Sequence, residues 1–185
     1  CGTTSSTLAE FKLASIIGNG MVLQREQPLP IWGWDDPDTE VTVTIAGKSA
    51  SAKADQNGRW LVRLPAMDAG GPFEMKVKGS DTATVKDVLV GEVWFCSGQS
   101  NMEWTVRNSN NPEEEISAGM YPEIRHIKIP HVPAAEPQAT VNTSGWQATT
   151  PDTVANFTAV GYFFGRELHK ELGVPIGLIG CNWGG

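Results

Sequence analysis

The sequence is poor in several features that define whole classes of protein. It has 3 cysteines in 185 residues, none in a Cys-x-x-Cys pair, which excludes a disulfide framework. Lys and Arg number 14 against 21 Asp and Glu, a net charge of −7. Because nucleic acid recognition needs a basic surface, we expect no nucleic-acid partner. No apolar run reaches the ~18 residues that would cross a bilayer.

What the sequence does contain favours a folded, turn-rich chain. Hydrophobic residues make up 40%, enough for a core, while 20 Gly and 12 Pro favour β-structure with turns over a helical bundle. A chain of 185 residues can hold one or two domains. Its acids, cysteines and histidines show no spacing typical of a metal site, and no phosphate-binding loop is present, so we expect no metal and no cofactor.

Residues 11–87 contain short strand patterns separated by turn residues. Val41–Ile45 alternates apolar and polar side chains, and Asp55-Gln56-Asn57-Gly58 is a hairpin turn signal. Further strand patterns lie at 29–34, 49–54, 60–64 and 73–77. Strands at intervals of roughly 8–12 residues predict an antiparallel β-sandwich over 11–87. Trp32, Trp34 and Trp60 fall in these strands, so we expect them in the sandwich core.

Residues 88–185 show a different pattern. The apolar runs 88–90 and 93–96 are typical of strands buried on both faces. Residues 154–172 repeat apolar side chains at helical spacing, with Gly173 as a stop signal, and 176–181 is again strand-like. We also expect a strand at 124–129, a short helix starting at 112 and a loop over 130–145. The order strand, helix, strand predicts an α/β unit with parallel pairing, and its small size predicts the first, incomplete part of a larger domain.

The three cysteines divide into two kinds. Cys96 and Cys181 lie in apolar runs, so we expect buried, inert side chains. Cys1 begins a small, polar stretch that resembles the mature end of a bacterial lipoprotein. That resemblance implies lipidation at Cys1, a flexible tether over 1–10, an extracytoplasmic location and membrane contact through this anchor alone. The alternative is that Cys1 is an artificial chain start.

Ser100 follows a buried strand pattern and the turn residue Gly98. A strand-to-turn junction exposes a side chain at the carboxyl end of the sheet, where open α/β sheets bind their ligands. Backbone N–H groups beside such a serine can stabilise an oxyanion, as in a nucleophile elbow, although the Gly-x-Ser-x-Gly pattern is absent. The alternative is a serine that caps the following helix.

The longer string from Val93 to Trp104 resembles the nucleophile block of the sialate O-acetylesterase family, which belongs to the SGNH-type serine esterases. The stretches 20–25, 31–34, 57–60 and 70–73 are similar to the leading β-domain of that family, 160–168 to its first long helix, and 176–185 to its second block. The resemblance extends over nearly the whole chain from Phe11. It implies that 88–185 is the N-terminal part of a flavodoxin-like SGNH domain, incomplete in this chain.

The resemblance also implies roles for individual residues. Ser100 matches the nucleophile. Its backbone N–H and one from Gly184 or Gly185 would form the oxyanion hole. The residues Gln99, Asn101, Trp104 and Trp183 are candidates for lining the substrate site.

The family's third block and its closing Asp-x-x-His block have no match in this sequence. The resemblance places them beyond Gly185, so we expect the catalytic base and acid outside this chain, in a longer precursor or a companion chain. The isolated chain is then expected to be nearly inactive. The histidines present, His126, His131 and His169, are interpreted as structural rather than as the base.

Three hypotheses about function follow. The first is a serine esterase that removes O-acetyl groups from carbohydrates, sialic acid or related glycans, through an acetyl-enzyme on Ser100. The second is a non-catalytic module that binds a glycan or a protein partner. The third is one structural half of a two-chain enzyme. An exposed sheet edge and self-association of the isolated chain would favour this hypothesis.

Overall fold

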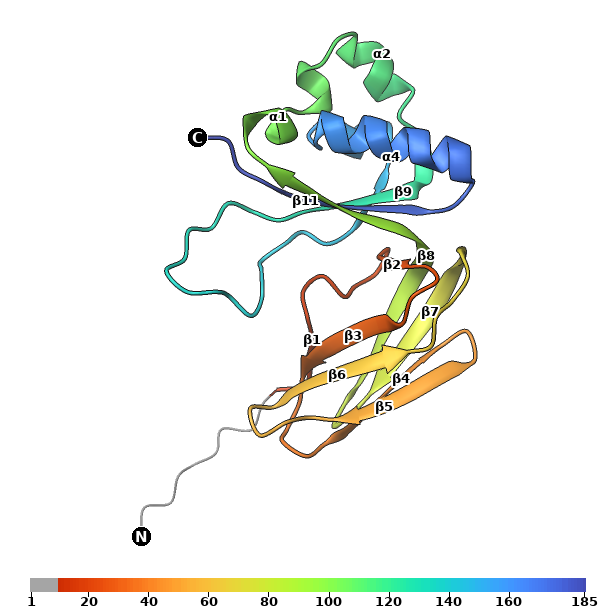
Figure 1. Ribbon diagram of the computed structural model, residues 1–185, viewed down its shortest axis with the longest axis vertical. Helices are drawn as coiled ribbons and strands as arrows, with labels where there is room; N and C mark the ends of the chain where they lie inside the picture. The colour runs from red at the N-terminus through yellow and green to blue at the C-terminus, as the bar shows by residue number, and fades with distance from the viewer. Residues whose placement is uncertain (1–9) are drawn as a thin grey trace.

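The computed structural model describes residues 10–185, so the expected lipidation of Cys1 and the tether up to residue 9 lie outside it. Figure 1 shows a β-rich half that begins the chain and a half in which helices cover a sheet. The strands are β1 (Lys12–Leu13), β2 (Val22–Gln24), β3 (Leu29–Trp34), β4 (Glu40–Ile45), β5 (Lys48–Lys53), β6 (Arg59–Leu64), β7 (Gly70–Lys78), β8 (Thr82–Gly98), β9 (Tyr121–Lys128), β10 (Gln147–Thr149) and β11 (Ile176–Asn182). The helices are α1 (Ser100–Glu103), α2 (Pro112–Ser117), α3 (Pro151–Val154) and α4 (Ala159–Leu172), with a 3-10 turn at Val106–Asn108.

In the β-rich half, the antiparallel sheet β1-β3-β6 shares one hydrophobic core with strands β4, β7 and β8. Strand β6 shows why: Trp60 and alternate residues after it are buried, and the residues between them face outward. Trp60 therefore lies in the core, as predicted. The expectation that Trp32 and Trp34 are core residues is only partly correct, because they pack against the core without being fully buried. Both are only partly buried, because they sit on the alternate, outward positions of β3.

Strand β8 is 17 residues long and connects the two halves (Figure 1). Residues up to Val90 pair antiparallel with β7, and residues from Glu92 onward pair parallel with β11. One eight-stranded sheet, of order β10-β9-β11-β8-β7-β4-β5, thus runs through the molecule, and β2 pairs with β8 beside it. The chain is a mixed α/β protein, as predicted, with parallel pairing in its second half. The predicted domain boundary at residues 87 and 88 falls inside this strand.

In the second half, α4 packs on β11 through glycines. A Cβ on Gly165 would lie 3.0 Å from the Leu178 side chain, and one on Gly161 would lie 2.8 Å from Cys96 Sγ. The small residues therefore let the helix approach the sheet closely. The predicted helix 154–172 is divided: α3 ends at Val154, and α4 starts after Thr158, whose hydroxyl accepts the Gly161 N–H at 3.2 Å. Its end at Gly173, with φ of 62°, is as predicted.

The expectation that 93–96 is buried on both faces is wrong for its aromatic residues. Trp94 is 43% exposed and Phe95 is 63% exposed, whereas Cys96 is buried. Among the described residues, β8 pairs beyond Glu92 with β11 on one side only, so this stretch of β8 lies at an edge of the sheet. Cys96 is buried as expected, and burial raises the pKa of its thiol to about 11, which keeps it protonated. Cys181 is only partly buried.

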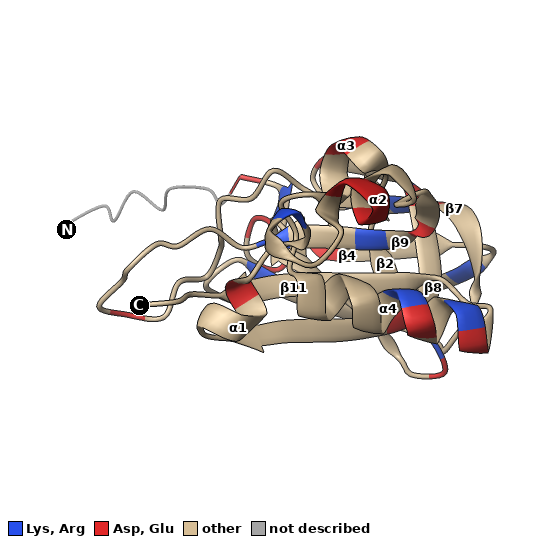
Figure 2. Ribbon diagram, turned by 90° about the horizontal axis from the view of Figure 1, so that it is seen from above, with Lys and Arg blue, Asp and Glu red and all other residues tan. Residues whose placement is uncertain are grey.

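Arg125 on β9 ties the two halves together. Its guanidinium donates to both carboxylate oxygens of Asp87 on β8, at 2.6 and 3.1 Å, and to the carbonyls of Gly20 and Pro122. Figure 2 shows charged residues on elements of both halves, with an acidic first turn on α2 (Glu113, Glu114 and Glu115). Acids at that position face the positive end of the helix dipole. Within residues 10–185, no helix has the length and apolarity needed to span a membrane.

Candidate active site

Ser100 lies just after the end of β8, at the start of α1. The strand ends at Gly98, Gln99 precedes the helix, and Ser100 is the first residue of α1, exposed to solvent. Gly98 has φ of 148°, a conformation that residues with a side chain rarely adopt. The strand–turn–helix context that the sequence predicts around Ser100 is therefore present. The first N–H groups of a helix have no acceptor within the helix, so they can face an oxyanion.

The end of β11 closes against this turn. The Trp183 N–H donates to the Gly98 carbonyl at 3.0 Å, and the Gly184 N–H donates to the Glu103 carboxylate at 2.6 Å. A Cβ on Gly184 would lie 3.0 Å from Ser100 Oγ and 2.9 Å from Glu103 Oε2. A side chain at residue 184 would therefore crowd Ser100 and Glu103. The structure brings Ser100 and Gly184 together, as the motif resemblance implies.

Gly184 differs from its expected role in one respect. Its N–H is occupied by Glu103 in this structure, so it is not available to an oxyanion unless that carboxylate moves away. The oxyanion donors that remain from the expected set are the backbone N–H groups of Ser100 and Gly185. Gly185 lines the same hollow as Ser100.

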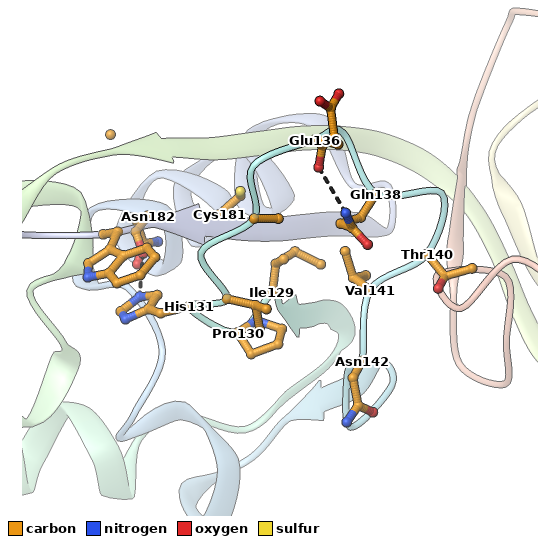
Figure 3. Close-up of a pocket in the computed structure, with 14 residues that line it drawn as sticks. Ile129, Pro130, His131, Glu136, Gln138, Thr140, Val141, Asn142, Cys181 and Asn182 are labelled. Atoms are coloured by element: carbon orange, nitrogen blue, oxygen red, sulfur yellow. Dashed lines mark hydrogen bonds between the residues drawn. The ribbon is translucent and has the colours of Figure 1, made fainter.

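His131 joins this cluster from the loop after β9. Its Nε2 lies 3.2 Å from Glu103 Oε1 and 2.7 Å from the Asn182 carbonyl oxygen, and its ring stacks on Trp183 with centroids 4.6 Å apart. Figure 3 shows His131 against Asn182 at one end of the hollow that the loop encloses. Both neighbours of Nε2 are acceptors, so Nε2 is the donor in these contacts.

Two hollows flank the cluster. One, of about 430 Å³, contains Ser100. Its lining residues are Ser100, Glu103, Trp104, Thr105, Asn108, Lys128, Gly184 and Gly185. The other, of about 560 Å³, is bordered by His131, Cys181, Trp183 and the loop up to Asn142 (Figure 3).

The four candidate lining residues are distributed unequally. Trp104 is 56% exposed in the Ser100 hollow, where its Nε1 donates to the Asn108 carbonyl at 2.8 Å. Trp183 borders the neighbouring hollow instead. Gln99 and Asn101 are exposed and are not among the lining residues of either hollow.

The other two histidines lie apart from Ser100. His126 is 4% exposed on β9, with its ring 4.4 Å from that of Phe157, and burial lowers its pKa to about 4. His169 Nδ1 lies 2.8 Å from the Val174 carbonyl near the end of α4. Both positions fit the structural interpretation. In residues 10–185, no group of three or more His, Cys, Asp or Glu side chains is arranged to hold a metal ion.

Sequence reasoning gave no role to Glu103, Lys128 or His131. Glu103 carried a usable signal, because residues three apart on a helix share one face and Glu103 follows Ser100 by three. Lys128 is the last residue of β9, which pairs with β10 and β11. His131 lies in the loop that follows, which has no periodic pattern. Nothing in the sequence places these two beside Ser100.

Comparison with known proteins finds similar chains. The chain is 38% identical over 95% of its length to the human sialate O-acetylesterase, and 36% identical over 95% to the mouse one. A crystal structure of a carbohydrate acetylesterase from Xanthomonas citri covers 94% of the chain at 43% identity, with a TM-score of 0.90. No protein-family model matches the sequence.

The extent of these matches is asymmetric. The chain spans 37% of the human relative, 36% of the mouse relative and 40% of the chain in the Xanthomonas citri structure. Identity at this level along nearly all of its own length, together with the same fold, shows common ancestry. The chain is therefore similar, over 95% of its own length, to members of the sialate O-acetylesterase family.

Proposed function

We propose that the chain is part of a serine esterase that removes O-acetyl groups from carbohydrates through an acetyl-enzyme on Ser100. The observation that carries the proposal is the placement of Ser100, exposed after β8 and packed against Gly184, two residues beyond the end of β11. The names of the relatives support an acetylated carbohydrate as the substrate. Sialic acid or a related glycan is the form that we propose.

The proposed architecture is a β-sandwich over 11–87 followed by part of an SGNH-type α/β domain over 88–185. Two observations support it. The sheet β1-β3-β6 and the strands β4, β7 and β8 bury their apolar faces in one shared core, and the strands β9, β11 and β8 pair parallel with α4 packed on β11. In such a sheet, a ligand lies at the carboxyl ends of the strands, where Ser100 is.

The proposed reaction has two steps. Ser100 Oγ attacks the acetyl carbonyl carbon and gives its proton to a base, and the negative oxygen is held by the N–H groups of Ser100 and Gly185. The sugar oxygen then leaves with a proton, which produces acetyl-Ser100 and a free hydroxyl. Water attacks the acetyl group in the second step and releases acetate. The resemblance implies that the base is the histidine of an Asp-x-x-His block, which this sequence does not contain.

The test uses a chimera, because the chain spans only part of its relatives. In the Xanthomonas citri acetylesterase, the segment that this chain matches is replaced by residues 1–185. The chimera is treated with a serine-reactive fluorophosphonate and its intact mass is measured. The proposal expects one adduct, located at Ser100, and none in the Ser100→Ala variant. A chimera that releases acetate while its adduct lies elsewhere would contradict it. A chimera that binds the glycan without labelling or turnover would favour the binding-module hypothesis.

We expect Glu103→Ala to lower kcat of the chimera about tenfold, with KM nearly unchanged. The carboxylate accepts the Gly184 N–H at 2.6 Å and lies 3.2 Å from His131 Nε2. Its loss leaves the Gly184 N–H unsatisfied beside Ser100, while His131 Nε2 keeps the Asn182 carbonyl at 2.7 Å. An unsatisfied partly buried donor costs about 1–3 kcal/mol, and here the cost appears as misplacement of the turn.

The matched control is Glu103→Gln, whose amide oxygen still accepts the Gly184 N–H. We expect it to retain most of the kcat that Glu103→Ala loses. Steady-state rates of acetate release give kcat and KM separately. Equal kcat in Glu103→Ala and in the unsubstituted chimera would show that the carboxylate does not position the turn.

The exposed edge of β8 is where we propose that the rest of the α/β domain packs. Phe95 is 63% exposed, and Trp94 packs edge-on against Phe164 with ring centroids 5.0 Å apart on the surface. An apolar strand edge of this kind promotes association with other chains. We expect the isolated chain to self-associate and Phe95→Asp to shift it toward monomer in sedimentation velocity. A chain that stays monomeric at all concentrations would contradict this, and Leu172→Asp, at the end of α4, is the control.

A further inference from the structure

We propose that the outer face of the sheet β1-β3-β6 is a second carbohydrate site, which binds an acidic sugar. This face lies outside the Ser100 hollow and shares no lining residue with it. It has a hollow of about 600 Å³ between the sheet and the loop around Gln138. Its lining residues are Trp32, Gly33, Trp34, Asp55, Arg59, Trp60, Leu61, Pro137, Gln138 and Ala139.

Strand register brings the relevant side chains to one face. Trp34 pairs with Lys12 on β1 and with Arg59 on β6, and Trp32 pairs with Leu61. Partners in an antiparallel ladder point to the same side of the sheet. The Lys12 ammonium lies 5.1 Å from the centre of the Trp34 ring, which agrees with this arrangement. The face thus combines two partly buried indoles with the exposed Leu61 and two cations.

The charge of the face contrasts with that of the chain. The whole chain carries −7, yet this face gathers Lys12, Arg59 and, beside Pro30, Arg63. Within residues 10–185, none of these three forms an ion pair. The carboxylate in the lining, Asp55, accepts the N–H groups of Asn57 and Arg59 and is held in its turn. The cations are therefore available to an anionic group of a ligand.

These features fit a pyranose that carries a carboxylate. Indole rings provide the flat apolar surface against which the C–H face of a sugar ring packs, and a guanidinium pairs with a carboxylate in two parallel hydrogen bonds. The hollow is walled on one side by the loop of Gln138, which also borders the hollow beside His131. The choice of a sugar over other anions rests on the proposed function. The choice of an acidic one rests on the charge of this face.

The test is calorimetric titration of the Ser100→Ala chain with 3′-sialyllactose, with lactose as the neutral control. We expect saturable binding of sialyllactose and at least about tenfold weaker binding of lactose. Arg59→Ala and Trp32→Ala are each expected to weaken sialyllactose binding about tenfold, while Lys76→Ala, which removes an exposed cation on β7 outside both hollows, leaves it unchanged. Arg59 is the exposed first residue of β6, so its substitution does not disturb the core.

Several outcomes would overturn the second site. Absence of sialyllactose binding would do so, as would equal binding of lactose, or binding that is lost in Trp104→Ala, in the Ser100 hollow, and kept in Arg59→Ala. A glutamate-rich peptide that binds as well as sialyllactose would show a general anion surface rather than a sugar site. Because binding is measured without turnover, each of these results leaves the esterase proposal standing. Loss of acetate release in the chimera, conversely, leaves this site standing.

Discussion

Replacing Ser100 with alanine is expected to lower kcat for acetate release from the chimera by a factor on the order of 10⁶, with KM changed far less. Such a factor corresponds to about 8 kcal/mol of barrier. The effect is this large because the substitution removes the atom that forms the acetyl-enzyme. Water attack on the bound ester is the path that remains, assisted only by the oxyanion donors.

Ser97→Ala is the matched control for that result. Ser97 is an exposed serine on β8, three residues before Ser100, and it pairs with Cys181 on β11. Its substitution removes a hydroxyl from the strand that leads into the turn and leaves Ser100 in place, so we expect turnover within about twofold of the unsubstituted chimera. Acetate is measured by a coupled assay with an acetylated sugar as substrate.

An outcome in which Ser100→Ala retains more than about a hundredth of the rate would contradict the acetyl-enzyme. In that case, the Glu103 and His131 pair would be the group to test next as a base for direct water attack. These two residues are the ones to test because Glu103 and the Asn182 carbonyl hold the His131 ring in place through Nε2.

The parts of the fold that the sequence predicts well are those determined by local periodicity. β4 follows the alternation at 41–45, and α4 ends at Gly173 because that residue adopts the left-handed conformation that stops a helix. The predicted helix begins five residues before α4, at residue 154, because the apolar side chains keep their helical spacing from 154 through Phe157. The Thr158 cap, which ends that continuity, is visible only in the structure.

The errors at Trp94 and Phe95 have a different cause. Apolar content alone cannot separate a strand covered on both faces from one at the edge of a sheet, because that depends on which segments lie beside it. In the site, too, local sequence reveals some residues and only the fold reveals others. Ser100 could be found from its motif, and Glu103 from its spacing. His131 could not, because its contact with Glu103 depends on the path of the loop after β9.

The second large effect concerns stability rather than catalysis, and it comes from His126. Burial lowers the pKa of its imidazole from 6.5 to about 4. Its cross-strand partners, Gln147 and Leu178, carry no charge that could stabilise a protonated ring, and its Nε2 has no hydrogen-bond partner. Arg125, next to it in sequence, adds a positive charge in the same strand, although that charge is paired with Asp87.

The direction of the pH effect follows from linkage. Between pH 6.5 and 4, the unfolded chain binds a proton at His126 and the folded chain does not, so acidification favours unfolding. The stability that the neutral histidine provides is complete above pH 6.5 and is lost as the pH falls to about 4. A depression of this size is worth about 3 kcal/mol, a large share of the 5–15 kcal/mol typical of a domain.

We therefore expect His126→Leu to lose about 3 kcal/mol less stability than the unsubstituted chain between pH 7 and pH 4, measured by urea unfolding. His169→Asn is the control, because His169 lies near the end of α4 and bonds the Val174 carbonyl. The carboxylates titrate in the same way in all three chains. The difference between the variants in stability lost between pH 7 and pH 4 therefore reports His126 alone. Should His126→Leu not fold, an NMR titration of the His126 ring gives its pKa directly. A pKa above 6 in that titration, or parallel pH curves for all three chains, would show that the ring is hydrated and that its burial does not limit stability in acid.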